Sequence, residues 1–262
     1  MMKNLQKIGG IAALIGAATN LLALVMFITL APKGYGSDDP GQVVTFLADN
    51  QAFMRVWYVI IYLVFGVSLI FLSLALYERL KAGSPVLAQA VTTFGLIWAF
   101  LVIVIGTLSI NNLSTVVKLY GENPAQAATV WLTFDSVETG LGGGGGETVV
   151  NALWFLLLSW ASLRAKELPR ILNYLGVVIG VAGIISVVLA SLGLMVVYGL
   201  GLIIWLVWLG IVMLRRSPVS AASPSTEQQP FRLQGSTASR SIGEGENSAH
   251  PLSGAYNNIC GL

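Results

Sequence analysis

The sequence predicts an all-α protein that crosses a membrane six times. Of its 262 residues, 55% are hydrophobic and only 10% are charged, whereas soluble globular domains carry about 25% charged residues. The charges are also concentrated in short connectors between long apolar stretches. A bilayer imposes this distribution, because an ionised side chain near its centre is costly.

Six apolar stretches are long enough to form membrane-spanning helices. A helix needs about 20 apolar residues to cross about 30 Å of hydrocarbon. Residues 8–31 form a longer run than the apolar core of a signal peptide, which has about 7–15 residues, so we interpret them as the first span. Residues 171–214 are about twice as long as one span and must turn back, at 191–194. The expected spans are 8–31, 56–77, 87–110, 148–163, 171–190 and 195–214.

The distribution of basic residues predicts that both termini lie in the cytoplasm. Cytoplasmic loops of membrane proteins are enriched in Lys and Arg. With six spans in this orientation, only Lys33, Arg55 and Lys118 lie on the outer side. The inner connectors hold Lys3, Lys7, Arg79, Lys81, Arg164, Lys166, Arg170, Arg215 and Arg216. We therefore expect a multi-pass protein of the cell (cytoplasmic) membrane, with residues 1–216 as its transmembrane domain.

Aromatic residues at the ends of the spans agree with this topology. Trp57 and Tyr58 lie at the outer end of the second span, and Tyr77, Trp160 and Tyr174 lie near inner ends. Such rings prefer the headgroup boundary of a bilayer. We expect them to anchor the helices at that boundary or to pack within the bundle.

Two long outer loops contain segments with helical character. One is 42–51, and another follows the plausible helix start at Asn123-Pro124. The second segment has an apolar face, and we expect Asp135 and Glu138 to point roughly elsewhere. The segment is expected to lie on the outer membrane surface or to cap the bundle. The apolar face consists of Ala127, Val130, Trp131, Phe134 and Val137.

Residues 217–262 differ in character from the rest of the chain. They are rich in Ser, Gly, Pro, Asn and Gln, and we predict a disordered cytoplasmic tail. They also contain the single histidine, His250, and the single cysteine, Cys260. The apolar body therefore has no histidine or cysteine to hold zinc or haem, or to act in a catalytic triad. We expect no metal, no cofactor and no nucleic-acid partner.

Small residues recur at four-residue spacing in three spans, a pattern that lets helix backbones approach closely in lipid. The fifth span has Gly176 and Gly180, followed by Gly183. Ala12, Gly16 and Asn20 repeat the spacing in the first span, and Gly95 and Ala99 in the third. We expect these faces to pack within the bundle. A homodimer or another membrane partner is the alternative.

A run of glycines, 142–146, precedes the fourth span. A phosphate-binding loop would continue with Lys and Ser or Thr. Here Glu147, Thr148 and Val149 follow, so that interpretation fails. We interpret the run as a flexible hinge.

Five polar residues at the outer ends of the helices are the candidate binding residues. They are Arg55, Asn111, Asn112, Glu147 and Asn151. Glu147 and Asn151 are four residues apart and share a helix face. One interpretation is structural: hydrogen bonds between helices and an ion pair of Arg55 with Glu147. The other is the mouth of a small cavity open to the outside.

Three short stretches resemble a known family. They are 48–55 (ADNQAFMR), 76–81 (LYERLK) and 168–172 (LPRIL), with Gly176 and Gly180 beyond. Together they resemble a bacterial family of multi-pass membrane proteins known as domain of unknown function 4386, over about residues 8–214. The resemblance implies a prokaryotic cytoplasmic membrane. It supplies no activity and no catalytic residues.

The absence of charge inside the spans limits the function. Ion-coupled transporters usually keep a carboxylate near the middle of the membrane, and intramembrane enzymes usually need a titratable group. We therefore expect a non-catalytic membrane protein, a scaffold or an accessory subunit. The alternative is a small permease or binder of a neutral or apolar solute that uses an outward-facing cavity.

Overall fold

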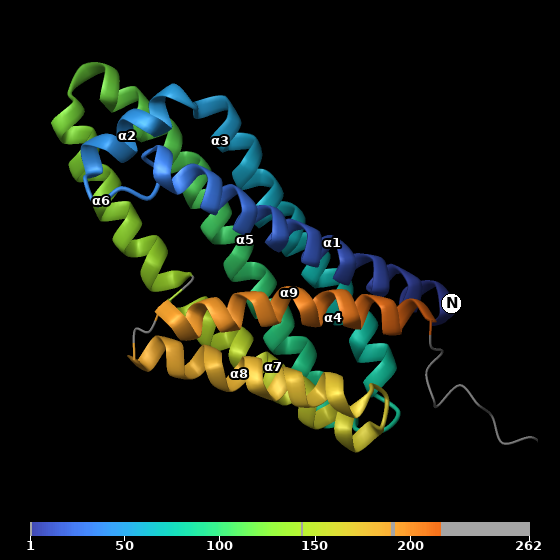
Figure 1. The fold of residues 1–262 in the computed structure, drawn as a ribbon. Helices are drawn as coiled ribbons and strands as arrows, with labels where there is room; N and C mark the ends of the chain where they lie inside the picture. The colour runs from blue at the N-terminus through green and yellow to red at the C-terminus, as the bar shows by residue number, and fades with distance from the viewer. Residues whose placement is uncertain (1, 143, 190–191, 216–262) are drawn as a thin grey trace, which may run out of the picture. The chain divides into compact units, whose positions relative to one another are not determined.

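The computed structural model describes residues 2–142, 144–189 and 192–215. In this part of the chain all regular secondary structure is helical (Figure 1). The predicted tail, 217–262, lies outside the described residues. The elements are α1 (Met2–Leu30), a 3-10 turn (Ala31–Lys33), α2 (Pro40–Asp49), α3 (Gln51–Tyr58), a π-helix (Val59–Val64), α4 (Phe65–Leu80), α5 (Pro85–Glu122), α6 (Pro124–Leu141), α7 (Gly146–Ala165), α8 (Arg170–Leu189) and α9 (Leu192–Arg215).

Six helices in the described part of the chain are long and apolar enough to cross a membrane. The prediction of an all-α, multi-pass membrane protein is therefore confirmed. The second span is continuous from Gln51 to Leu80, through α3, the π-helix and α4. The 44-residue block does fold back, into α8 and α9. The predicted turn, 191–194, is placed too late, because α9 already begins at Leu192, and residue 191 lies outside the described residues.

Helix α5 is much longer than the predicted span, 87–110. Polar side chains after residue 110 do not end it, because they hydrogen-bond to carbonyls of the preceding turn. Asn111 donates to Thr107, Ser114 to Ile110 and Thr115 to Asn111, at 3.0–3.2 Å. The helix ends only before Asn123, whose side chain caps α6 by accepting from the backbone N–H of Gln126.

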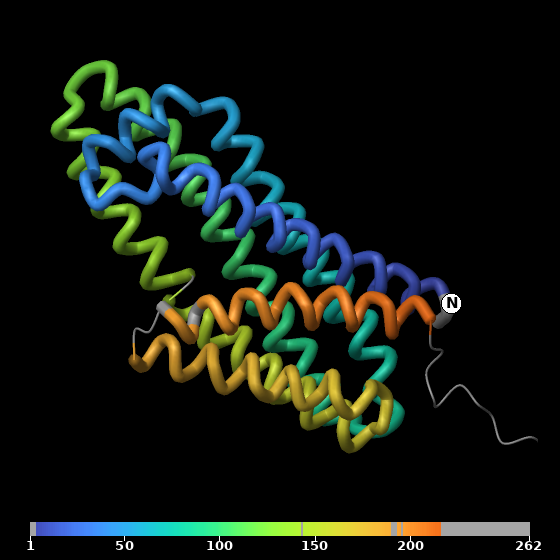
Figure 2. The backbone as a smooth tube through the Cα atoms, viewed as in Figure 1, coloured from blue at the N-terminus to red at the C-terminus, as the bar shows by residue number. Residues whose placement is uncertain are grey.

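The six long helices form a closed ring of neighbours (Figures 1 and 2). The order around the ring is α1, α4, α5, α7, α8, α9 and back to α1. We call the end where α1 begins and α9 ends the basic end. The opposite end, where α2, α3 and α6 lie, is the capped end. The basic end carries Lys7, Arg79, Lys81, Arg164, Lys166, Arg170 and Arg215.

Aromatic side chains fill the inside of this ring. Ring centroids lie 4.8 Å apart for Phe155 and Trp205, 5.4 Å for Trp98 and Trp154, and 5.5 Å for Phe65 and Trp98. All five side chains are buried. Such edge-to-face and tilted pairs add to the energy of burial, and they close the middle of the bundle with apolar groups.

The outward faces of the helices remain apolar. Large apolar side chains such as Phe100, Ile171 and Val188 are 65%, 66% and 76% exposed. A soluble protein rarely presents so continuous an apolar surface. Contact with lipid tails accounts for it, which agrees with a bilayer as the surroundings of this chain.

The small residues predicted to support helix packing contact helices of the same chain. A Cβ added at Gly180 would lie 2.8 Å from the Ala152 carbonyl oxygen, and one at Gly16 would lie 3.2 Å from the Phe65 ring. At Gly95 the added atom would meet Ser73 and Trp154. These close approaches agree with the prediction that the faces pack within the bundle.

One aromatic pair packs within the bundle, which was the second of the two expectations for such residues. Trp57 and Tyr58 are 5% and 8% exposed, and their stacked rings lie 5.7 Å apart. The segment between α1 and α3 covers them, with the Tyr35 ring 5.2 Å from Trp57. Trp160 and Tyr174 are exposed, as expected of anchoring residues.

A buried ion pair joins three elements at the basic end. Arg79 on α4 and Glu167 in the α7–α8 connection have side chains only 1% and 4% exposed, with Nε 3.3 Å from Oε2. Arg79 also donates to the Glu167 carbonyl at 3.0 Å and to Gln6 Oε1 on α1 at 3.2 Å. The sequence analysis placed Arg79 in an inner connector, whereas it lies on α4 with its side chain inside the bundle.

Candidate functional site

The capped end is assembled from short helices with well-defined starts. Asp39 caps α2 by accepting from the Gly41 N–H at 2.9 Å, and Pro40 is the first helical residue. Gly34 ends the 3-10 turn with a φ of 116°, a left-handed conformation that favours glycine. These turns place Tyr35 between α1 and α3, where its ring lies 6.5 Å from Phe27 and 5.2 Å from Trp57.

A partly enclosed cavity of about 300 Å³ lies at this end. We call it the capped-end cavity. Aromatic rings form part of its wall: Phe27, Tyr35, Tyr58 and Trp131. Polar side chains from α5 and α6 form another part: Ser109, Asn112, Asp135 and Glu138. The cavity therefore combines ring faces with hydrogen-bonding groups, as small-molecule sites do.

Two buried acceptor atoms of this wall have no hydrogen-bond partner in the described part of the chain. They are Oδ1 of Asn112, a residue only 7% exposed, and Oε1 of Glu138. The Ser109 hydroxyl, whose single proton can serve one acceptor at a time, lies 2.9 Å from the Ile105 carbonyl and also neighbours Glu138. Because buried polar groups are normally paired, the two free acceptors point to a donor that enters the cavity.

Tyr35, which lies in the loop between α1 and α2, is neutral at ordinary pH. Burial raises the pKa of Tyr35 to about 12, against a smaller opposing effect of its hydrogen bond with Tyr58. The Tyr35 hydroxyl therefore stays protonated and offers a ring face without a charge. Acidic charge in the cavity wall comes from Asp135 and Glu138 alone.

A π-helical turn follows the cavity wall directly. Residues Val59–Val64 come immediately after Tyr58. A Cβ added at Gly106 of α5 would meet Tyr62 in this turn, so the glycine allows α5 to approach it closely. Such turns occur often at functional sites, and this one lies next to a residue of the cavity wall, Tyr58.

The five residues predicted from the sequence separate into three places. Asn112 lines the capped-end cavity. Glu147 and Asn151 lie together on α7, deeper in the bundle. Asn111 is exposed and donates to its own helix, and Arg55 is exposed and donates to Ser114 Oγ at 2.8 Å. The expected ion pair of Arg55 with Glu147 is wrong, because each side chain has a different partner.

Glu147 is held inside the ring of helices by a tryptophan. Trp98 Nε1 donates to Glu147 Oε1 at 2.6 Å, and Asn151 also hydrogen-bonds Glu147. Helix α7 begins at Gly146, the last glycine of the run, and Glu147 therefore lies in its first turn. Thr148 Oγ1 donates to the Gly142 carbonyl at 3.3 Å. Residue 143 of this run lies outside the described residues, so the hinge stays a prediction.

Removing the Trp98 donor should destabilise the protein. We expect Trp98→Phe to lower the free energy of unfolding by about 1–3 kcal/mol, since Glu147 Oε1 loses its donor inside the bundle. Trp154→Phe is the matched control, because Trp154 Nε1 is buried without a hydrogen-bond partner in the described residues. Unfolding in mixed detergent micelles measures both. Equal losses in the two variants would mean that ring volume, and not the bond to Glu147, decides the result.

Sequence reasoning missed most of the cavity. We expected Asp135 and Glu138 to point away from Trp131, but all three line the same cavity. Positions 131, 135 and 138 are related by steps of four and three, which is one helix face. That spacing was the available signal. Tyr35 carried no comparable signal, because it lies in a loop whose path only the fold determines.

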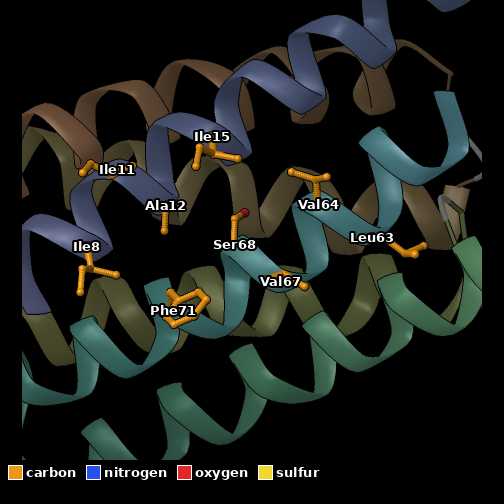
Figure 3. A pocket seen from close by; sticks show the side chains of 9 residues that line it. All are labelled: Ile8, Ile11, Ala12, Ile15, Leu63, Val64, Val67, Ser68 and Phe71. Carbon is orange, nitrogen blue, oxygen red and sulfur yellow. The ribbon is translucent and has the colours of Figure 1, made fainter. Parts of the chain in front are cut away.

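A second hollow is almost entirely apolar and lies on the outward surface, between α1 on one side and the π-helix and α4 on the other (Figure 3). Its volume is about 440 Å³. Ile8, Ile11 and Ile15 line it from α1, and Val64, Val67 and Phe71 from the opposite side (Figure 3). It carries almost no polar surface, so it can accept a lipid tail but cannot orient a polar solute.

No group of three or more His, Cys, Asp or Glu side chains that could hold a metal ion occurs in the described residues. We take the capped-end cavity as the candidate site, because it brings aromatic and polar side chains together.

The chain matches a family model described as "Domain of unknown function (DUF4386)" over residues 8–213. The protein belongs to this family. The match confirms the resemblance inferred from the three short stretches, and it spans all six long helices. Comparisons with curated proteins and with solved structures each found no match.

Proposed function

We propose that this DUF4386 protein is a non-catalytic membrane protein that binds a small solute in the capped-end cavity. The observation that carries this proposal is the pair of unpartnered buried acceptors, Asn112 Oδ1 and Glu138 Oε1, in the wall of a partly enclosed cavity. A solute with at least one N–H or O–H donor would satisfy them. Because both atoms accept, they favour such a solute over a purely apolar one.

The packed interior supports a binding role or an accessory role over a permease. A permease needs a path through the bundle, and Phe65, Trp98, Trp154, Phe155 and Trp205 occupy the middle of it. The solute would be held at one end, for a partner protein or as a signal. Catalysis would need a group that acts on the solute, and the proposal assigns none.

The test is ligand-dependent stabilisation of the purified protein. A ligand that binds only the folded state raises its stability, by about 2.7 kcal/mol at 100 times Kd. A panel of small solutes that carry hydrogen-bond donors is screened for those that stabilise the wild-type protein. We expect such a solute to lose most of its stabilising effect on the Asn112→Leu variant. Asn111→Leu is the matched control, because Asn111 is next to Asn112 but has an exposed side chain, which donates to a carbonyl of its own helix. The same stabilisation in all three proteins would place the solute elsewhere.

We further propose that the chain lies in a cytoplasmic membrane with its basic end inside. The excess of Lys and Arg at that end supports this orientation. Reporter fusions at residue 216 and within 34–39 should report opposite sides of the membrane. Reports from the same side would overturn the orientation and, with it, access to the cavity from outside the cell.

A partner in the membrane is also a proposal. A homodimer formed through the small residues was the alternative to their packing within the bundle. In the structure these residues contact other helices of the same chain. A homodimer or accessory complex would therefore use the exposed apolar faces, such as that of α8 around Ile171, Val178 and Val188. Chemical crosslinking in native membranes tests this, and a monomer at every protein concentration would count against it.

A further inference from the structure

The aromatic and acidic walls of the capped-end cavity meet in one small volume. Tyr35, Tyr58 and Trp131 line it together with Asp135 and Glu138. Ring faces attract cations through their quadrupole, by about 0.5–2 kcal/mol each depending on desolvation. A carboxylate attracts the same cation by charge and by charge-assisted hydrogen bonds.

We propose that the solute is a small organic cation, a primary amine in its ammonium form. This inference rests on the proposed binding function and names the class of solute. An ammonium group donates several hydrogen bonds, which suit Glu138 Oε1 and Asn112 Oδ1. Its alkyl or aryl body would lie against the rings of Phe27, Tyr35 and Trp131.

The position of the carboxylates supports a cation over a neutral donor. Glu138 is half-buried with one buried, unpartnered oxygen, and Asp135, one turn away, is exposed at the cavity. The salt bridges formed by the described residues are Arg79 with Glu167 and Lys81 with Glu78, both at the basic end. Lysine and arginine are absent from the cavity wall. The ionised form of a carboxyl group in such a wall is stabilised by a cation that enters the cavity from the solvent.

The surrounding charges would also attract cations. Residues 31–142, apart from the three basic-end residues Glu78, Arg79 and Lys81, contain three basic residues: Lys33, Arg55 and Lys118. The same region contains six acidic residues: Asp38, Asp39, Asp49, Glu122, Asp135 and Glu138. An acidic entrance raises the local concentration of cations and their rate of association.

The apolar groove between α1 and α4 was weighed as an alternative site. Nothing about it selects one occupant, because any acyl chain or apolar helix fits such a surface (Figure 3). The open hollow of about 830 Å³ beside Lys33, Asp39 and Asp49 is polar but has no unpartnered buried group. The capped-end cavity alone combines enclosure, charge and free acceptors among the hollows considered.

The experiment compares two probes of nearly equal shape on the purified full-length protein. One is 2-phenylethylamine, charged at pH 7, and the other is 2-phenylethanol, which is neutral. We expect the amine to bind at least about tenfold more tightly than the alcohol, a difference of about 1.4 kcal/mol. In Glu138→Gln the amine should lose this advantage, while the affinity for the alcohol stays unchanged. Asp135→Asn provides a second variant if Glu138→Gln fails to fold.

Glu122→Gln is the control for long-range charge, because this acid is exposed and lies outside the cavity wall. It should leave both affinities within about twofold at physiological salt, where exposed charges are screened. An equal loss of amine binding in Glu122→Gln and Glu138→Gln would overturn the contact with Glu138. If the alcohol binds as well as the amine, the ammonium inference fails while the binding function stands. If neither probe binds, the inference fails. The solute panel, compared between the wild type and Asn112→Leu, then decides the binding function separately.

Discussion

Replacing Arg79 with methionine should lower the free energy of unfolding by about 3–5 kcal/mol, the largest effect expected for one substitution here. The variant leaves Glu167 buried and without its cation, since Arg79 Nε lies 3.3 Å from Glu167 Oε2 in a place closed to solvent. It also removes the donors to Gln6 Oε1 and to the Glu167 carbonyl. Three elements, α1, α4 and the α7–α8 connection, lose their shared contact.

Lys81→Met is the matched control for Arg79→Met. Lys81 pairs with Glu78 at 2.8 Å, but the two side chains are 41% and 27% exposed. An exposed pair contributes about 0–1 kcal/mol, so the control should unfold close to the wild type. The double variant Arg79→Met with Glu167→Leu should recover part of the loss, because no isolated charge remains buried. A double variant less stable than Arg79→Met alone would contradict this account of the pair.

Replacing Gly95 with valine should cost about 3 kcal/mol, at the upper end of the usual range for overpacking. Gly95 lies on α5 where α4 and α7 meet it, and an added Cβ would meet Ser73 Oγ and lie 2.8 Å from Trp154 Nε1. Ser73 and Trp154 are themselves fully buried, at 0% exposed. Neither neighbour has room to move, so the helices must separate and the edge-to-face and tilted aromatic pairs of the interior must shift.

Gly121→Val is the control for Gly95→Val. It makes the same substitution on the same helix, but Gly121 is exposed and an added Cβ meets nothing within 4 Å. Surface changes of this kind usually stay within about 0.5 kcal/mol. Denaturant unfolding of both variants in mixed micelles gives the comparison. Similar losses at the two sites would show that the glycines matter for backbone conformation and not for close packing.

The fold could be predicted from the sequence because lipid imposes a simple rule. Apolar runs of sufficient length, separated by charged connectors, indicate spanning helices. The rule does not say where a helix ends once it leaves the membrane, and α5 continues to Glu122 on hydrogen bonds of Asn111, Ser114 and Thr115 to its own backbone. It also does not distinguish a solvent-facing arginine from a buried one, as Arg79 demonstrates.

The candidate site was predictable only in part. Asn112 was identified, because polar residues at the end of a span stand out against apolar neighbours. Asp135 and Glu138 were assigned to the wrong direction, although their spacing from Trp131 places all three on one face. Tyr35 and Tyr58 come together through the path of the loop between α1 and α2 and through the π-helical turn. Such contacts between distant segments depend on the folded backbone and are invisible in a single sequence.

The most direct test of the account asks whether the capped-end cavity is open to solutes on one side while the bundle interior stays closed. Cys260 is first replaced by serine, and single cysteines are then placed at Ser109, in the cavity wall, and at Ser73, in the packed interior. A small membrane-impermeant thiol reagent is applied to each side of oriented membranes. The account predicts that Ser109→Cys reacts only from the capped end and that a bound amine protects it, whereas Ser73→Cys does not react from either side. Reaction of Ser109→Cys from the basic end, or of Ser73→Cys from either side, would contradict it by revealing a path through the bundle.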